Sequence, residues 1–542
     1  MFNRFFNSQT KTITFAAFLL LASAFLSRVL GLFRDRLLAG RFGAGEELDI
    51  YFAAFRIPDF IYAILIMGGV AVVFLPVFSE HFQKKEEEAW RFANNLLNCF
   101  LFFLVLLCGV LFFLAPLLVS LIAPGFSTES KELAVSLTRI MFLSPIFLGL
   151  SSIFSGILHY FNRFLVYSIA PIFYNLGIIF GIVFFVPLFG VKGLAFGVIL
   201  GAVFHLLIQI PAVRISGYKY TPVFNFKGSG LRKVFKLMLP RTIGAAAYQI
   251  NLIVVTAIAS TLTAGSIAVF NFANNLQFFP IGLVGVSFAI AAFPALSRAW
   301  AEGIKEKFLE AFYSTFRQIL FLIIPASLLM FLLRAQLVRI VLGTGEFGWL
   351  ETRLTAACLG IFCLSIFAAG FFPFLARVFY SLQDTKTPVI IGMSSMLLNV
   401  ALALLFTFFL KQPNFFQEFF INILKLQGIK NIAVIGLPLA FSISQVFQFF
   451  LLLLFLRKRI SGLKFGEIFS SFKKIAMAAV LMGFSVYFSL SLTAEFISIQ
   501  TFLGIFLQTA IAGGVGVFVY ILITYLLKSP ELKTIKSAIT KS

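Results

Sequence analysis

The chain has 542 residues, of which 60% are hydrophobic and only 12% are charged, and its mean hydropathy is +1.02. A soluble domain is about half apolar and about one-quarter charged, so this composition excludes a soluble globular protein and a disordered or fibrous chain. The 43 Lys and Arg residues outnumber the 21 Asp and Glu residues, which leaves a net charge of +22. In so apolar a chain this excess predicts a membrane protein with basic cytoplasmic loops, an anionic substrate, or both, rather than a nucleic-acid partner.

The N-terminus resembles a secretory signal, but we interpret it as a transmembrane helix. Arg4 and Lys11 precede an apolar run from Phe15 that contains the cleavage-like triplet at 22–24. The run continues to Leu32 and many more apolar runs follow it, so an uncleaved first helix is predicted.

Runs of about 20 apolar residues, the length that crosses a bilayer as a helix, recur along the whole chain. Breaking them at charged or Gly- and Pro-rich joints predicts about fourteen spans. Their centres fall near residues 22, 65, 107, 147, 177, 203, 250, 284, 322, 364, 397, 444, 482 and 514. The prediction is an all-α polytopic membrane protein whose two termini lie on the same side.

The basic residues choose that side. About 26 Lys and Arg residues fall in the termini and the even-numbered loops, against about nine in the odd-numbered loops. Because cytoplasmic loops are enriched in Lys and Arg, we expect both termini in the cytoplasm of a bacterium, with the chain in its inner membrane.

The chain also repeats itself. Ala44-Gly45 corresponds to Ala264-Gly265, and the residues ending at Ser79 correspond to those ending at Ser297, with shifts of 220 and 218. Asn175 and Asn399 correspond with a shift of 224. The shift spans six helices, so we predict two parallel six-helix lobes, 1–226 and 227–465, around a central cavity, as in transporters that rock one lobe against the other. Residues 466–542 would add two helices and a basic tail.

Cysteine and histidine offer no site. Cys99, Cys108, Cys358 and Cys363 all lie inside apolar runs without a CxxC pair, which is typical of packing residues. The three histidines are scattered along the sequence, so no metal site is predicted. Glycines spaced by four in 177–181 and 193–201 predict close helix packing.

Charges at membrane depth are the candidate functional residues, because each costs about 2.5–3.5 kcal/mol to insert. The first lobe carries Arg28, Arg34, Asp35, Arg36, Asp49, Arg56 and Asp59. The second lobe has fewer candidates, namely Arg241, Asn274, Asn275 and Arg377. Pro58, between Arg56 and Asp59, is expected to kink or unwind the second span.

Two interpretations of these arginines compete. In one, they line a cationic cavity for an anionic head group, since a guanidinium can bond two phosphate oxygens at once. In the other, they reach an interface or pair with Asp35, Asp49 and Asp59. The apolar neighbours of Arg28 and Arg56 favour the cavity, whereas Arg36 and Arg41, near a helix end, favour the second interpretation.

At these residues the sequence resembles the MurJ (MviN) family, the bacterial lipid II flippases of the multidrug/oligosaccharidyl-lipid/polysaccharide exporter superfamily. The resemblance lies in the stretches at 27–35, 42–45 with Asp49, 54–59, 162–164, 170–171, 175–177, 379–381 and 384–388. It covers nearly the whole chain and implies a transporter rather than an enzyme. It also implies that the last two helices form a groove for a lipid tail.

The resemblance implies a cavity whose arginines hold the pyrophosphate of a polyprenyl-linked disaccharide-pentapeptide. Arg28, Arg34, Asp35 and Asp49 stand where family cavity residues stand. The chain departs from the family at other positions. Tyr62 and Ala63 stand where the family usually has an Arg in the second helix, and Met67 stands where a Glu is common. Asn275 stands where the family has an Arg in the eighth helix. Helices 7, 11 and 12 lack the interior carboxylate of the family's sodium site.

Other functions stay open at this point. The absence of a GxxxxGK[ST] motif gives no sign of ATP hydrolysis and favours a secondary transporter without a cofactor. We expect a monomer in membrane lipid, which the membrane potential or a coupling cation could drive. An exporter of another polyprenyl-pyrophosphate-linked oligosaccharide, or of a cationic drug, is an alternative. A polytopic enzyme acting on lipid-linked sugars is a third, although the longest predicted external loop, 411–430, offers only Glu418 as an acid.

Overall fold

The structure is a computed structural model that describes residues 13–65, 71–429, 431–460, 462–463, 466–498 and 500–532. Within these ranges the chain is helical and contains no strand, so the predicted all-α class is confirmed. Arg4, Lys11 and Met67 lie outside the described residues, as does the part of the predicted basic tail after residue 532.

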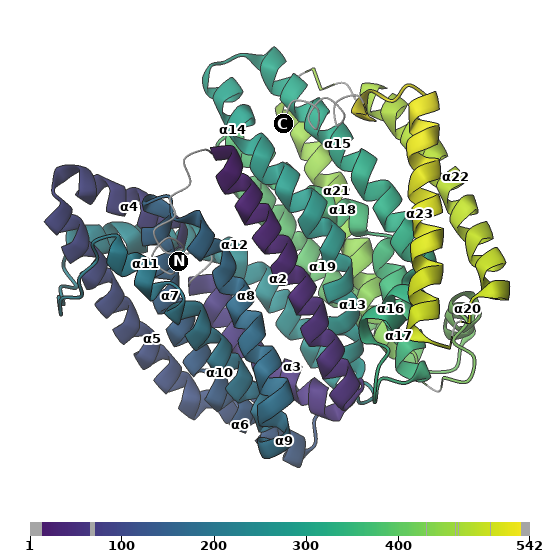
Figure 1. Cartoon of the computed structure of the whole chain (residues 1–542), viewed down its shortest axis with the longest axis horizontal. Coiled ribbons are helices and arrows are strands. Elements are labelled where there is room, and N and C mark those ends of the chain that lie inside the picture. The colour runs from purple at the N-terminus through teal and green to yellow at the C-terminus, as the bar shows by residue number, and fades with distance from the viewer. Residues whose placement is uncertain are drawn as a thin grey trace. The chain divides into compact units, whose positions relative to one another are not determined.

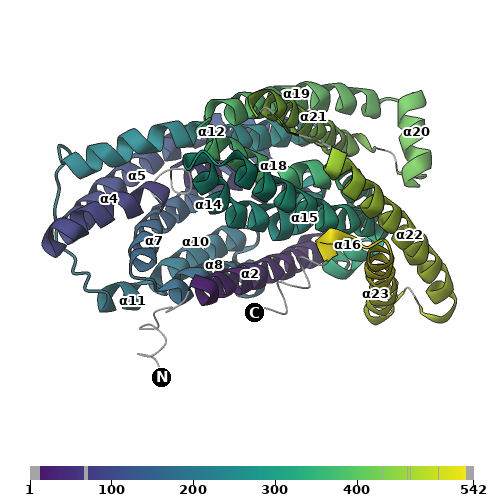
Figure 2. The same ribbon diagram turned by 90° about the horizontal axis from the view of Figure 1, so that it is seen from above.

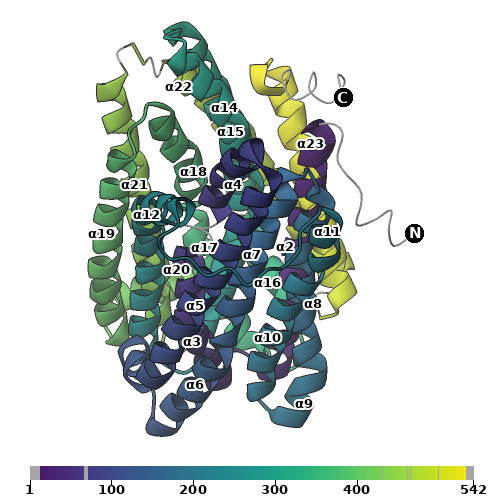
Figure 3. The same cartoon turned by 90° about the vertical axis from the view of Figure 1, so that its left-hand side faces the viewer.

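The chain divides into two compact units, 1–268 and 269–542. In Figure 1 the first unit runs from the purple α2 to the teal α12. Its helices are α2 (Ile13–Phe42), α3 (Glu46–Ile61), α4 (Ala71–Lys84), α5 (Glu86–Ile122), α6 (Thr128–Met141), α7 (Leu143–Tyr160), α8 (Phe164–Phe180), the π-helix η2 (Gly181–Phe185), α9 (Val186–Phe189), α10 (Lys192–Leu207), α11 (Ile210–Ile215) and α12 (Ser229–Ser260). Figure 3 shows α6 and α9 at one end of this unit and α4 and α11 toward the other.

The second unit contains the remaining helices apart from the first turn of α13. They are α13 (Ser266–Pro280), the π-helix η3 (Ile281–Val286), α14 (Ser287–Ala301), α15 (Lys305–Leu332), α16 (Arg334–Leu342), α17 (Trp349–Cys363), α18 (Ile366–Ser381), α19 (Lys386–Lys411), α20 (Phe415–Leu424), the 3-10 turn η4 (Ala433–Ile435), α21 (Gly436–Arg459), α22 (Gly466–Phe496) and α23 (Phe502–Leu526). The C-terminal helices α22 and α23 pack on each other and against α15 and α16 (Figure 2).

The predicted span centres fall on these helices or on the joints inside broken ones. Ten helices among the described residues are long and apolar enough to cross a membrane, and α17 and α18 form a further pair bent by 49°. The predicted centre at residue 364 lies in that bend. The total of fourteen spans stays a prediction, and so do the lobe boundaries at 226 and 465.

Three prolines inside membrane helices leave a carbonyl without its helical N–H donor, and another helix supplies a donor to each. Pro58, Pro116 and Pro325 free the carbonyl four residues before them. The Thr138 hydroxyl lies 3.3 Å from Ala54 O and 2.8 Å from Ala134 O of its own helix, between which it can share its proton. Phe112 O accepts from Arg139 Nε (3.1 Å), and Phe321 O accepts from the Tyr520 hydroxyl (2.7 Å). Backbone groups in lipid need such partners, so these side chains make the prolines tolerable.

Pro58 does not unwind α3, one of the two effects that the sequence predicts, and a kink there stays a prediction. Helix α3 continues through Pro58 to Ile61, and a π-helical turn follows at 62–65. The Thr138 hydroxyl lies within hydrogen-bond distance (3.3 Å) of the freed Ala54 carbonyl, and the backbone stays helical at the proline and changes its hydrogen bonding about one turn later.

The glycines spaced by four pack α8 against α10, as predicted. A Cβ on Gly177 would lie 2.3 Å from the Gly201 backbone, and one on Gly181 would lie 2.4 Å from Gly197. These backbones approach so closely that any side chain would separate the helices. The four cysteines are buried and free, which agrees with a packing role.

Candidate functional site

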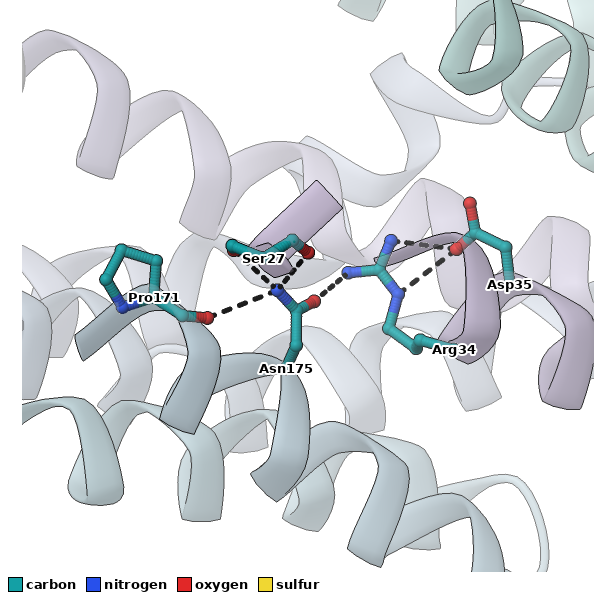
Figure 4. A network of polar contacts seen from close by, with 5 residues as sticks. All are labelled: Ser27, Arg34, Asp35, Pro171 and Asn175. Atoms are coloured by element: carbon teal, nitrogen blue, oxygen red, sulfur yellow. Dashed lines mark hydrogen bonds and ion pairs between the residues drawn. The ribbon is translucent and has the colours of Figure 1, made fainter. Parts of the chain in front are cut away.

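Arg34 and Asp35 of α2 form an ion pair beside α8. Arg34 Nη2 and Nε lie 2.8 and 3.1 Å from the same Asp35 oxygen, and Arg34 Nη1 donates to Asn175 Oδ1 at 3.3 Å (Figure 4). The Arg34 side chain is 23% exposed, whereas that of Asp35 is 3% exposed. The structure therefore holds this guanidinium in a defined orientation by groups from two helices.

Asn175 is the member of this network that the charge pattern does not reveal. Its Nδ2 donates to Ser27 O (3.3 Å), Ser27 Oγ (3.2 Å) and Pro171 O (3.2 Å), so its Oδ1 is turned toward Arg34 (Figure 4). Two features of the sequence could have pointed to Asn175: it is an amide inside an apolar run, and it corresponds to Asn399 in the repeat. Asn175 acts as a positioning residue for Arg34.

The other basic residues of α2 occupy different environments. Arg28 and Arg36 are half-buried, and Arg41, in the last turn of α2, is exposed. The exposure of Arg41 matches its predicted position at a helix end. Arg28 lies six residues, less than two turns, before Arg34 on the same helix.

Asp49 of α3 binds the first turn of α13. Its Oδ2 accepts from Gly265 N and its Oδ1 from Ala268 N, both at 2.8 Å, and the side chain is only 3% exposed. The first N–H groups of a helix have no partner within the helix and favour a negative charge. Asp49 therefore caps α13 from another helix, a role that the resemblance alone does not indicate.

Backbone contacts surround this cap. A Cβ on Gly265 would lie 1.9 Å from Ala44 O, and one on Gly125 would lie 2.2 Å from Ser260 O. Gly125 N also donates to Ser260 Oγ at 3.2 Å. The α2–α3, α5–α6 and α12–α13 connections thus meet with little space between them.

Arg56 and Asp59 lie one turn apart on α3, and both are half-buried. Arg56 Nε donates to Thr256 Oγ1 of α12 at 2.8 Å, and the Thr256 hydroxyl donates to Leu252 O at 2.8 Å. A helix of the first lobe is thereby tied to the seventh predicted span.

Two candidates of the second lobe bond within their own helices. Asn274 accepts from Gln277 Nε2 on the same helix (2.9 Å), Asn275 is half-buried, and Arg377 Nη1 donates to Pro373 O (3.2 Å) of its own helix. Arg241 belongs to α12, but its side chain lies outside the described residues. The bonds of Asn274 and Arg377 given above each lie within one helix.

Asp384 shapes the turn that starts α19. It accepts from Thr387 N at 3.0 Å and from Thr387 Oγ1 at 2.7 Å. Partial burial acts to raise the pKa of Asp384, but these hydrogen bonds outweigh it and hold the pKa below its ordinary value. The carboxylate thus stays charged and stabilises the turn. Among the described residues there is no group of three His, Cys, Asp or Glu side chains that could hold a metal ion.

Known proteins match this chain along most of its length. The family model described as lipid II flippase MurJ matches residues 38–507. A probable lipid II flippase MurJ of Buchnera aphidicola subsp. Acyrthosiphon pisum is 33% identical over 379 residues, which cover 69% of this chain and 74% of the relative. A solved structure of lipid II flippase MurJ in an inward closed conformation superposes with a TM-score of 0.75 at 26% identity, covering 94% and 98% of the two chains.

A multidrug resistance MATE family transporter of the MOP superfamily, in an inward-facing conformation, shares the fold alone. Its TM-score is 0.65 at 18% identity, covering 83% of this chain and 99% of the transporter. The family model covers far more than half of the chain. The chain therefore belongs to the lipid II flippase MurJ family.

Proposed function

We propose that this protein flips lipid II across the bacterial inner membrane by alternating access and so supplies the precursor for peptidoglycan and the cell wall. Family membership and the many apolar helices support this function. The substrate is an anionic polyprenyl-pyrophosphate lipid. We further propose a transporter that works as a monomer, without a cofactor and without enzymatic activity, with both termini in the cytoplasm.

Arg34 is the observation that carries the proposal of a cationic cavity. Its bonds to Asp35 and Asn175 occupy three of its five N–H donors, and the side chain is 23% exposed. A guanidinium held in place loses little conformational entropy when it binds a phosphate. Arg28 and Arg56 would add charge to the same head-group site, and Asp35 would keep Arg34 oriented.

Asp49 supports a closed state at the extracytoplasmic end. In the predicted orientation, the α2–α3, α5–α6 and α12–α13 connections all lie outside. Two hydrogen bonds to a buried carboxylate contribute about 1.5–3 kcal/mol each. At the cytoplasmic end α12 is joined to α4 by Lys233 and Glu80 (2.6 Å), an exposed pair that adds little stability. Opening outward would require the Asp49 bonds to break.

An exporter of another polyprenyl-pyrophosphate-linked oligosaccharide is the alternative. It is favoured by Tyr62 and Asn275, which stand where the resemblance leads us to expect arginines. The membrane potential could reset a cationic cavity, at about 2.3 kcal/mol per charge per 100 mV. A transport assay at zero potential tests that coupling.

Complementation tests the substrate assignment. The chain is expressed in cells depleted of their own lipid II flippase, and growth should be restored. Failure to grow, despite normal amounts of protein in the membrane, would contradict lipid II as the substrate. Flipping of a different lipid-linked oligosaccharide in proteoliposomes would then identify the alternative.

Labelling of a single cysteine tests the closed end. We place the cysteine at Ala44 and compare Asp49→Ala with Glu47→Ala, which changes an exposed carboxylate on the same turn. Asp49→Ala should increase labelling by an impermeant reagent added outside, whereas Glu47→Ala should not. Equal labelling of the two variants would argue against Asp49 as the closing contact.

A further inference from the structure

A cavity of about 730 Å³ lies between α5 and α6, apart from the arginines described above. Its wall combines the apolar Phe112 and Pro116 of α5 with the charged Lys131, Glu132 and Arg139 of α6. All of these residues belong to the first unit. The cavity thus has an apolar side and a charged side.

Arg139 lies deep along its helix. It follows Thr128, the first residue of α6, by eleven residues, which at 1.5 Å per residue is about 16 Å. Its guanidinium lies 4.8 Å from the centre of the Phe112 ring, and its Nε donates to Phe112 O at 3.1 Å. A charge at such depth marks a functional residue or a pair by default.

The bond to Phe112 O explains only part of this arginine. Pro116 leaves that carbonyl without its helical donor, and any neutral donor could replace it. The two terminal NH₂ groups of Arg139 make no hydrogen bond to the part of the chain that the structure describes. The nearby Lys131 donates to Pro124 O at 3.2 Å, and Lys131, Glu132 and Arg139 together leave one positive charge in the cavity wall.

The outer surface next to the cavity is suited to lipid. Phe113, Leu117 and Leu121 are spaced by four residues along one stripe of α5 and are 79%, 59% and 65% exposed. In a membrane helix such a stripe faces acyl chains. A molecule that enters the cavity from this side therefore comes from the bilayer.

We propose that the cavity binds an anionic glycerophospholipid from the leaflet at the α5–α6 end. The phosphate bonds to the terminal NH₂ groups of Arg139, and the Lys131 ammonium adds attraction. The glycerol and the upper acyl chain lie on Phe112 and Pro116. This site concerns membrane lipid rather than the transported substrate, so it does not depend on the proposed flippase mechanism.

Photo-cross-linking in nanodiscs tests the site with the full-length protein. The discs consist of phosphatidylcholine with a small fraction of photoactivatable phosphatidylglycerol, and cross-links are mapped to peptides of α5 and α6. Matched discs contain photoactivatable phosphatidylcholine or a photoactivatable undecaprenyl pyrophosphate. The three probes distinguish an anionic phospholipid, any phospholipid and a substrate-like lipid.

The variants separate the charge of Arg139 from its structural bond. Pro116→Ala returns an N–H donor to Phe112 O, so in this background Arg139→Gln removes the charge without leaving that carbonyl unsatisfied. We expect phosphatidylglycerol cross-linking to be about tenfold lower in the double variant than in Pro116→Ala alone, which is the effect of losing one charge-assisted hydrogen bond. Glu132→Gln should increase it, because it removes the negative charge of the wall.

Three outcomes would overturn the proposal. They are equal labelling by phosphatidylglycerol and phosphatidylcholine, labelling that Arg139→Gln leaves unchanged in the Pro116→Ala background, and preferential labelling by undecaprenyl pyrophosphate. Thermal unfolding of each variant verifies that it is folded, and a variant with an unchanged unfolding temperature but lost labelling supports the proposal.

Discussion

The second predicted span of each lobe has the same backbone irregularity but different charge. The π-helical turn at 62–65 and η3, which begins at Ile281, start 219 residues apart. The same shift matches Arg56 of α3 with Asn275 of α13. The repeat thus keeps the helix geometry in both halves while the charged side chain occurs in only one.

The shared π-helical turns concern how the two spans bend, whereas the difference in charge concerns which of them can bind an anionic head group. A π-helical turn is a weak point at which a helix can bend, and the second span of each lobe has one. A pyrophosphate needs positive charge, which the neutral Asn275 does not supply. We infer that both lobes are built to move, whereas the first carries most of the head-group charge.

The largest expected effect comes from removing Arg34. Arg34→Ala should abolish rescue in the complementation assay, a loss of at least about 100-fold in transport, because two or more charge-assisted hydrogen bonds to the head group are lost. Arg28→Ala is expected to have a similar effect. Arg36→Ala, on the same helix, is the control and should be tolerated.

Asn175→Ala refines this test. It removes the side chain that orients Arg34 but leaves the charge, so transport should fall less than in Arg34→Ala. Rescue by Arg34→Ala at the wild-type level would place the head-group charge elsewhere and remove the contrast between the lobes.

The repeat supplies a matched pair of glycines for the next largest effect. Gly265 has φ +88°, and a Cβ there would lie 1.9 Å from Ala44 O. Its counterpart Gly45 has φ −110°, and its Cβ would lie 3.2 Å from Phe42 O. Gly265→Ala should cost at least about 2 kcal/mol, since a left-handed conformation alone costs about 1–2 kcal/mol. Gly45→Ala should cost much less.

Thermal unfolding of the two purified variants measures this difference. The labelling of a cysteine at Ala44 then shows whether Gly265→Ala also opens the extracytoplasmic end. Equal stability of the two variants would mean that the two lobes use these corresponding glycines in the same way.

A charge exchange between corresponding positions tests the contrast more directly. Arg56→Asn should reduce transport about tenfold, the effect of one charge-assisted bond. Adding Asn275→Arg restores the net charge but places it on α13 instead of on α3, where Arg56 bonds to the Thr256 hydroxyl. We therefore expect no rescue by the double variant. Full rescue would show that total charge matters and that its lobe does not.

The sequence was sufficient for the all-α membrane class because the bilayer imposes a length on every span. Runs of about 20 apolar residues predict helices wherever they occur, and even the bend between α17 and α18 falls at a predicted centre. The glycines spaced by four residues in α8 and α10 also predict the close packing of these two helices correctly. Exact helix ends follow local hydrogen bonding, as at 62–65, and were beyond this kind of inference.

The site was predicted as residues but not as contacts. Arg34 and Asp35 stand out because charges are costly in a membrane, whereas Asn175 lies 141 positions from Arg34 and is neutral. The partners of Asp49 are backbone N–H groups, which every residue but proline has, so no sequence pattern marks them. Donors for proline-freed carbonyls likewise come from distant helices.

The smallest expected effect concerns how each unit satisfies a carbonyl freed by proline. In the first unit Thr138 of α6 serves Ala54 O, within the repeated helices. In the second, Tyr520 of α23 serves Phe321 O, from a helix pair outside the repeat. Tyr520→Phe should cost about 1 kcal/mol, whereas Tyr525→Phe, at 68% exposure, should cost nothing measurable.

A second variant separates this hydrogen bond from the packing of the ring. Pro325→Ala returns the helical N–H to Phe321 O, so Tyr520→Phe should lose most of its effect in that background. The non-additivity in a double-mutant cycle, measured by thermal unfolding, is the coupling between α23 and the proline of α15. If the two changes are additive, the hydroxyl does not serve the freed carbonyl, and the two units no longer differ in this respect. Coupling of about 1 kcal/mol would instead mean that Tyr520 of α23 supplies the donor for the carbonyl freed in α15. In the first lobe the side chain near the carbonyl freed in α3 comes from α6, a helix of the same lobe.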